Sequence, residues 1–360
     1  MIRSFFIGIC RKNILLSFFV LILLLFNANV NAAVNDAAIQ SNQLPKKLSE
    51  FGFFEDPIKQ IPVKNVIPYE LISPLFSDYA RKQRFVYVPI GKKATHRTDF
   101  VYQFPIGTAL IKTFYYLDDE RNEESGRQLL ETRVLLRKRN GWDAASYVWN
   151  KETNDADLKI AGQSINSSWL SKEGELMSVR YRVPNKNQCQ ECHESNTKII
   201  PIGPKARNLN KEIFYSDLNG ELNQLRYWLS RGIIDSYPES IEKVVGWNDK
   251  NKDIEKRARS YLAINCGHCH SPTGNAASSG LYLNFTEDRP KQLGVLKKPV
   301  AAGRGSGDKL YSIVPGKPEE SILLYRMQST DPGIMMPESG RALNHKEGID
   351  LIANWITSLN

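Results

Sequence analysis

The chain has 360 residues, of which 41% are hydrophobic and 24% are charged. This composition excludes a disordered or collagen-like chain and is typical of a folded protein large enough for two domains. Five cysteines are too few for a disulfide-dense scaffold. The formal net charge is +9, and it falls to +6 without the three positive charges of residues 1–32, so we expect no nucleic-acid partner.

The N-terminal residues have the pattern of a cleaved targeting signal. Arg3, Arg11 and Lys12 form a positive start, and an apolar run follows at 14–26. That run is too short to span a bilayer comfortably, and small residues lead up to Ala32. The pattern predicts a secretory signal peptide that ends at Ala32, and therefore a periplasmic protein, with an uncleaved membrane anchor as the alternative.

Cysteine spacing decides the class of the protein. Cys10 leaves with the signal peptide, and four cysteines remain. They fall into two C-x-x-C-H motifs, which is the c-type haem attachment pattern. The motifs are Cys189-Gln-Glu-Cys192-His193 and Cys266-Gly-His-Cys269-His270.

The spacing within each motif has a chemical reason. Two cysteine sulfurs bond to one edge of the porphyrin, and the adjoining histidine becomes the proximal ligand of the iron. A zinc site would need further ligands at zinc spacing, and a thioredoxin-like pair would need a βαβ setting. We therefore expect two covalently bound haem c groups, with covalent attachment at Cys189, Cys192, Cys266 and Cys269 and with His193 and His270 as proximal ligands.

The region from 47 to 184 has the pattern of antiparallel strands. Short runs rich in β-branched and aromatic residues are separated by turn residues. Two of these runs flank Asn140-Gly141, the strongest short-range signal for a hairpin. We expect this region to form a β-rich domain.

Helical periodicity occurs further along the chain. Apolar residues recur at helical spacing over 219–235, 253–265, 318–328 and 344–359. The second of these helices runs into the second motif, and the last helix can cross it, which is the frame of class I cytochromes c. We therefore expect an α+β fold made of a flexible leader (33–46), an antiparallel β-rich N-terminal domain (47–184), a first haem-binding segment (185–250) and an all-α class I-like cytochrome c domain (251–360).

A methionine loop supplies a distal ligand for the second haem. Met335-Met336-Pro337 follows a Pro-Gly turn, and class I cytochromes take their sixth ligand from such a loop. Methionine sulfur is a soft donor, and its ligation raises the reduction potential. Core packing is the alternative role for these side chains. We assign Met336 rather than Met335 because Met336 directly precedes the proline.

The distal position of the first haem is less defined by the sequence. No Met-Pro segment lies between the two motifs. Met177, His96 and the absence of a protein ligand are the open alternatives. His268 lies within an attachment loop and is expected to point away from its own iron, and His345 is expected to cap the last helix or face solvent.

The chain resembles a largely uncharacterised family of exported bacterial dihaem c-type cytochromes with a β-rich N-terminal region. The resemblance implies a C-terminal cytochrome c domain and two haems, but little about mechanism. Residues 104–108 are also faintly similar to the β domain of cytochrome P460 enzymes, in which a lysine cross-links the haem; no equivalent lysine is assigned here. The segments that carry the family resemblance are 73–80, 104–108, 201–210, 265–270 and 335–341.

We expect a periplasmic dihaem cytochrome that transfers electrons between redox partner proteins, such as other cytochromes or a periplasmic dehydrogenase. Contact with the membrane would be transient and through a partner. One alternative is a dihaem enzyme, peroxidase-like or P460-like, that uses an open first haem; no catalytic side chain is assigned for it. The other is a binding module in which the haems only stabilise the fold.

Overall fold

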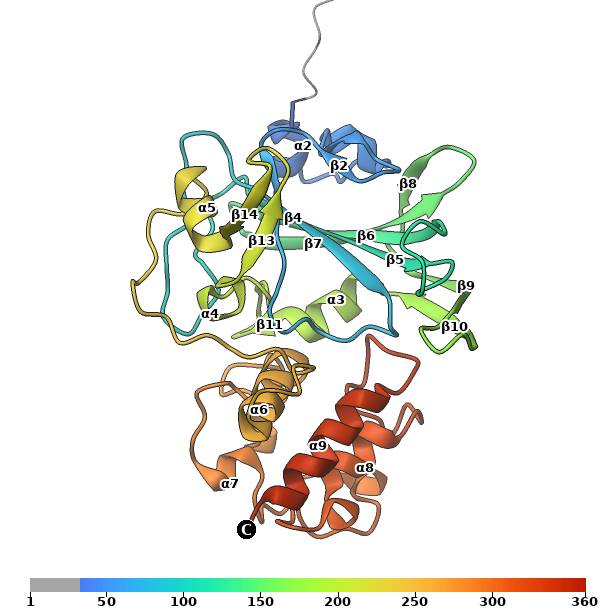
Figure 1. The fold of residues 1–360 in the computed structure, drawn as a ribbon, viewed down its shortest axis with the longest axis vertical. Coiled ribbons are helices and arrows are strands. Elements are labelled where there is room, and N and C mark those ends of the chain that lie inside the picture. Colours follow the sequence, from blue (N-terminus) through green and yellow to red (C-terminus); the bar gives the residue numbers. More distant parts are fainter. Residues whose placement is uncertain (1–32) are drawn as a thin grey trace, which may run out of the picture.

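The computed structural model describes residues 33–360, so the predicted signal peptide lies outside the described residues. A β-rich part occupies the top of Figure 1, and a part with short helices lies beneath it. The centre of the β-rich part is a six-stranded antiparallel sheet with its strands in sequence order. The strands are β3 (Val66–Pro68), β4 (Arg81–Tyr87), β5 (Ala109–Leu117), β6 (Arg127–Lys138), β7 (Gly141–Asn150) and β8 (Asp155–Leu158).

The predicted hairpin at Asn140-Gly141 is confirmed. Strands β6 and β7 pair directly, from Lys138 opposite Gly141 to Glu131 opposite Val148. Gly141 has a φ of 130°, a left-handed value that residues with a side chain rarely adopt. The glycine therefore lets the chain reverse within two residues.

Residues alternate between the two faces of the sheet, and each face has its own core. Ile111 belongs to a core on the upper face, where α2 (Asp36–Gln40) packs, and Leu110 and Phe114 belong to two cores on the other face. Lys112 lies between Leu110 and Phe114 on the strand and shares their face. The expected flexible leader thus contains a helix, and its Ile39 is fully buried.

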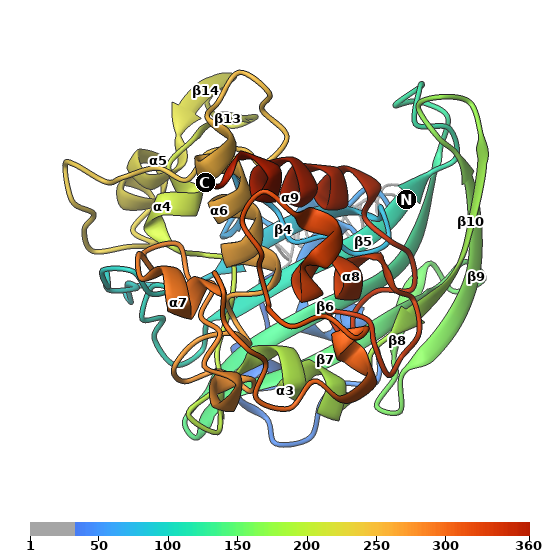
Figure 2. The same ribbon diagram turned by 90° about the horizontal axis from the view of Figure 1, so that it is seen from below.

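Two shorter hairpins lie outside the central sheet. Strands β9 (Gln163–Leu170) and β10 (Leu176–Val183) pair with each other and lie at one side of the molecule in Figure 2. Strands β13 (Glu212–Tyr215) and β14 (Gly220–Asn223) form a second hairpin, followed by α5 (Gln224–Ser230). The helix expected over 219–235 is therefore confirmed only over Gln224–Ser230. It is wrong over 219–223, where a turn leads into the extended β14, and over 231–235, where the chain turns at Gly232.

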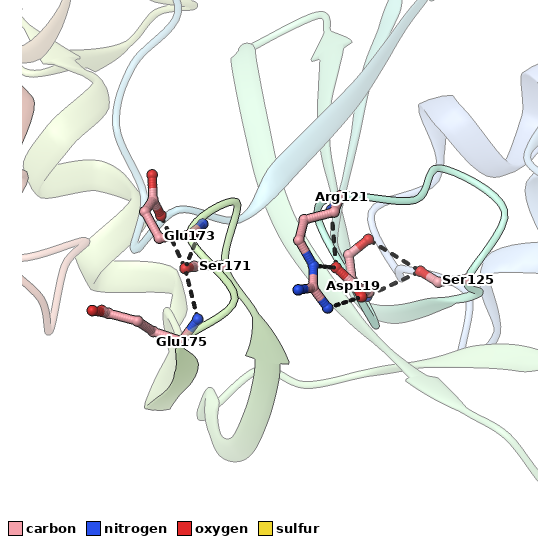
Figure 3. Close-up of polar contacts among 6 residues, drawn as sticks. All are labelled: Asp119, Arg121, Ser125, Ser171, Glu173 and Glu175. Carbon is pink, nitrogen blue, oxygen red and sulfur yellow. Dashed lines mark hydrogen bonds and ion pairs between the residues drawn. The ribbon is translucent and has the colours of Figure 1, made fainter.

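Side chains near the β9–β10 hairpin stabilise two tight turns (Figure 3). The Ser171 hydroxyl donates to Glu173 at 2.9 Å, and it accepts from the Glu173 backbone N–H at 3.2 Å. Arg121 donates twice to the Asp119 carboxylate, at 2.9 and 2.7 Å, and the Ser125 hydroxyl contacts the backbone of Asp119. These polar groups form their hydrogen bonds within their own turns, so their role is structural.

The C-terminal part begins with α6 (Ile254–Asn265) and ends with α9 (Lys346–Ser358), and these two helices pack on each other. Around them lies a core that includes Leu262, Ile352 and Trp355. The Asp253 side chain caps α6 by accepting from the N–H of Lys256, so the predicted helix at 253–265 is confirmed. Among residues 33–360, no helix is long and apolar enough to cross a membrane.

The expected all-α class I-like cytochrome c domain, and with it the expected fold class, is wrong. The protein is β-rich, with a six-stranded antiparallel sheet, and its eight described helices are short. Between α6 and α9 there are only α7 (Pro290–Leu293) and α8 (Ile322–Gln328). The rest of that stretch consists of turns, 3₁₀ segments and isolated parallel bridges such as the one between Val295 and Ile313. Glycine and proline recur along this stretch and interrupt any helical period.

Candidate functional site

A cavity of about 620 Å³ lies between the sheet and the C-terminal part. Its walls come from strands β4 to β7, from α3 (Lys186–His193) and from the C-terminal helices. All four motif cysteines and both motif histidines line this cavity, and none of the cysteines is in a disulfide. The two motifs, far apart in the sequence, therefore open into one space.

The first motif is carried by α3. The Asn185 side chain accepts from the N–H of Gln188 at 2.9 Å and begins the helix directly after β10. Helical spacing then places Cys189, Cys192 and His193 on one face. His193 Nδ1 is 2.7 Å from the carbonyl oxygen of Ile200. As the donor to that carbonyl, Nδ1 fixes the ring and leaves Nε2 for a metal, as metal-binding histidines do.

The second motif follows the last turn of α6. The His270 backbone N–H donates to the carbonyl of Cys266 at 2.9 Å, which closes a turn around the motif. His270 Nδ1 lies 3.4 Å from the Ser279 hydroxyl, so Nε2 is again the nitrogen left for a metal. A Cβ at Gly267 would come within 2.8 Å of the backbone oxygens of Ala263 and Leu283, so only glycine fits at this position.

The two motifs contact each other directly. Cys269 Sγ lies 3.7 Å from the carbonyl oxygen of Glu191, inside the first motif. Just after the motifs, the N–H of Asn196 donates to the carbonyl of Thr273 at 2.9 Å, and the hydroxyls of Ser195 and Thr273 are 2.8 Å apart. These contacts join two segments that are far apart in the sequence, as does the β-bridge between Ser195 and Gly274. The sequence pattern alone therefore does not predict them.

Burial disfavours the charged forms of His193, His270 and Cys266. It lowers the pKa of His193 to about 3, with further contributions from Lys112 and from His268, and it lowers the pKa of His270 to about 4. Burial also raises the pKa of Cys266 to about 12. A neutral imidazole is the form that binds metal, whereas a thiol with a raised pKa is a poor redox nucleophile. The second property argues against the thioredoxin-like alternative.

The two neighbouring methionines, Met335 and Met336, lie in different surroundings. Met336 lines the cavity, whereas Met335 is 2% exposed and lies outside the cavity lining. The Met336 N–H donates to the carbonyl of Arg326 at 2.9 Å, and the buried Arg341 guanidinium donates to the Met336 carbonyl at 3.0 Å. The loop is thus held in place with Met336 at the cavity wall.

The residues considered for the first haem are placed differently. Met177 lies on β10 beside a separate core, and His96 lies edge-on to Tyr102 at 5.7 Å between ring centroids. Neither residue lines the cavity, so the structure does not bring them to Cys189 and His193. His268 does line it, and His268 Nδ1 is buried without a hydrogen-bond partner within residues 33–360.

His345 also lines the cavity, but its ring is already held. It stacks on Phe76 at 4.2 Å between ring centroids, and its Nδ1 lies 3.1 Å from the Tyr261 hydroxyl. The expected N-capping contact is not made by this side chain, because α9 begins at Lys346 with no side-chain cap. His345 is therefore a part of the cavity wall whose ring is held by Phe76 and Tyr261.

A row of cations on the sheet also faces the cavity. Lys82, Arg84, Lys112 and Arg133 are among its lining residues. The sequence carries one signal of this arrangement, since Lys112 interrupts the otherwise apolar and aromatic run of β5. Burial, together with Arg133 and Arg84, lowers the pKa of Lys112 to about 7.

The donor set at the cavity fits two c-type haems. Each motif presents two free cysteines and one histidine whose Nδ1 is already hydrogen-bonded. A zinc site needs three or four protein donors around one point, and the part of the chain from 33 to 360 contains no such group of His, Cys, Asp or Glu.

Comparisons with protein-family models, curated proteins and solved structures find no match.

Proposed function

We propose that this protein is an exported dihaem c-type cytochrome that carries electrons between redox partners in the periplasm. The observation that carries the proposal is the opening of both C-x-x-C-H motifs into one cavity. Bound haem c would supply a one-electron iron couple at each motif. The signal-peptide pattern supports export, which places the chain where redox partners and haem attachment are found.

The protein side chains have distinct roles in this proposal. The cysteines anchor the cofactors, and His193 and His270 bind iron through Nε2. Hydrogen bonds to Ile200 and Ser279 hold the two rings in orientation. Apolar residues such as Leu110, Ile264 and Leu323 line part of the cavity, and an apolar surrounding favours the less charged, reduced state of a buried metal.

The contact between the motifs favours a relay rather than two independent sites. Cys269 and the backbone of Glu191 are in van der Waals contact, so the edges of the porphyrins bonded to these motifs would be neighbours. Electrons that enter at one motif can then leave from the other without a partner in between. This geometry supports electron transfer over a structural role for the haems.

Replacing Met336 tests the second haem. We expect Met336→Ala to abolish the sulfur-to-iron charge-transfer band of the oxidised protein and to lower the potential of one haem, because a soft sulfur donor stabilises ferrous iron. Met335→Ala is the control, since Met335 is buried outside the cavity lining. Absorption spectra and redox titration measure both effects, and loss of the band in the Met335 variant instead would contradict the assignment.

Binding of carbon monoxide distinguishes an electron-transfer role of the first haem from a catalytic role. We propose His268 as the distal ligand there, because it lines the shared cavity and is close enough to His193 for the two charges to interact. The wild-type protein should then be low-spin at both haems and should ignore carbon monoxide, whereas His268→Ala should bind it at one haem. Spin state is read by electron paramagnetic resonance.

The enzyme alternative predicts the opposite result. An open first haem in the wild-type protein would bind carbon monoxide directly, and His268→Ala would change nothing. Peroxide turnover at about 1–1000 per second would then replace the carrier assignment with a catalytic one.

A further inference from the structure

Three cations stand side by side across the central strands of the sheet. Arg84 on β4 is directly opposite Lys112 on β5, and Lys112 is directly opposite Arg133 on β6. Residues that are opposite each other share a face, so all three side chains leave the sheet on the cavity side. Like charges in opposite positions destabilise a sheet, and this row therefore requires compensation.

The compensation within the protein is incomplete. Arg133 pairs with the Glu131 carboxylate at 2.5 Å, but Arg133 Nε is buried without a partner. Within residues 33–360, Arg84 and Lys112 form no side-chain hydrogen bond or ion pair. Lys82, on the same face as Arg84, donates only to the Ala80 carbonyl at 2.8 Å.

The nearby carboxylates form no ion pair with Arg84 or Lys112 within residues 33–360. Glu131 is fully buried, and its Oε1 accepts from both Arg133 and the Tyr181 hydroxyl. The Asp78 carboxylate accepts from the N–H groups of Ala342 and Leu343 at 2.7 and 2.8 Å. Glu131 Oε2 is buried without a partner, but within residues 33–360 Glu131 forms an ion pair with Arg133 alone. Glu70, whose charge acts on Arg84, pairs instead with Lys211 at 2.5 Å.

An aromatic ring partly offsets the repulsion among the cations of this face. The Phe114 ring has Lys82 at 5.8 Å, Lys112 at 5.0 Å and Arg133 at 4.4 Å from its centroid. The electron-rich ring faces attract cations, but one ring carries no net charge. Arg84 keeps its charge without a partner among residues 33–360, and buried charges without partners are costly. The lowered pKa of Lys112, about 7, shows the same cost at its neighbour.

We propose that Arg84, Lys112 and Arg133 form a binding site for a carboxylate or a small oxyanion in the shared cavity. Arginine and lysine are the side chains that bind such groups, and arginine does so through paired N–H donors. The anion can come from two sources. One is a propionate of the haem attached at the first motif, which rests on the proposed function, and the other is a free oxyanion that enters the cavity.

The row lies close to the first motif. Arg133 and Lys112 both act on the pKa of Cys189, although burial is the larger effect and raises it. His193, in the same motif, also lies within reach of the Lys112 charge. An anion held by the row would thus sit beside the first haem-attachment site.

The experiment compares the exported wild-type protein with Lys112→Gln, Arg84→Gln and the control Lys250→Gln, which removes one charge from an exposed residue outside the cavity. Inorganic phosphate and acetate serve as probes of free-anion binding by titration calorimetry. Resonance Raman bands of the haem propionates report whether these groups are hydrogen-bonded. Thermal unfolding checks that each variant is folded, and Lys112→Gln should fold because it removes like-charge repulsion.

Each outcome decides between the sources or rejects the site. If a propionate is bound, its Raman band shifts in Lys112→Gln and Arg84→Gln but not in Lys250→Gln, and the probes do not bind the wild-type protein. If the anion is free, the probes bind the wild-type protein at least tenfold more tightly than the two cavity variants. The inference is overturned if both haems are present and neither readout differs from the control. A protein without haem instead contradicts the proposed function, and phosphate titration still tests the anion site.

Discussion

Replacing Cys266 and Cys269 together by serine is expected to remove one covalent haem and to unfold the C-terminal part of the protein. Cys266 follows the last turn of α6 and packs against the core that includes Leu262 and Trp355. Tyr261, Ile264 and Asn265 of α6 line the cavity, so this helix depends on what fills it. Intact mass after export and the thermal unfolding curve measure the two effects.

The matched control is the same change in the first motif. Cys189→Ser with Cys192→Ser should also remove one haem, but α3 contains no fully buried residue, and the sheet beneath it has its own cores. Unfolding of the C-terminal part should therefore stay close to that of the wild type. An equal loss of stability in both double variants, or an unchanged mass in either, would contradict the assigned roles.

Replacing Glu131 by alanine is expected to lower the free energy of unfolding by about 3–5 kcal/mol, the cost of breaking a buried ion pair from one side. The Glu131 side chain is 0% exposed, pairs with Arg133 at 2.5 Å and accepts from the Tyr181 hydroxyl at 2.7 Å. Its removal leaves Arg133 beside Lys112 with no carboxylate between them. Denaturant unfolding of the full chain measures the change.

An ion pair of the same length on the surface serves as the control. Glu123 pairs with Arg81 at 2.5 Å, but its side chain is 72% exposed. Glu123→Ala should therefore cost less than about 1 kcal/mol, because water screens the interaction. Similar costs for the two variants would mean that Glu131 does not neutralise the cation row.

Local patterns in the sequence predicted the elements that depend on neighbouring residues. The hairpin at Asn140-Gly141 and the helix before Cys266 are confirmed, since turn chemistry and an N-cap act over a few residues. The choice of Met336 over Met335 stays a prediction; of these two residues, Met336 lines the cavity and Met335 does not.

The features that sequence reasoning missed depend on strand register and on long-range packing. Arg84, Lys112 and Arg133 are far apart in the sequence and become neighbours only through the pairing of three strands. The contact between Ser195 and Thr273 is of the same kind. A pattern read along one segment carries no information on which strand lies beside which.

The expected all-α domain was wrong for a different reason. The helices that flank the second motif were identified, but the chain between them was assumed to follow a known helical frame. Glycine and proline residues in that stretch favour turns and isolated bridges, as at Tyr311 and Ser321. Two C-x-x-C-H motifs can therefore line one cavity without a class I fold.

The number of covalent haems per chain tests the central claim most directly. The full chain, with its N-terminal segment, is produced together with the haem-attachment machinery, and the intact mass of the exported protein is measured after denaturation. We expect the mass of the chain from Ala33 onward plus two haems, with colour that stays on the protein after acid-acetone extraction. A mass with one haem or none, or colour lost to the solvent, would contradict the assignment of both motifs.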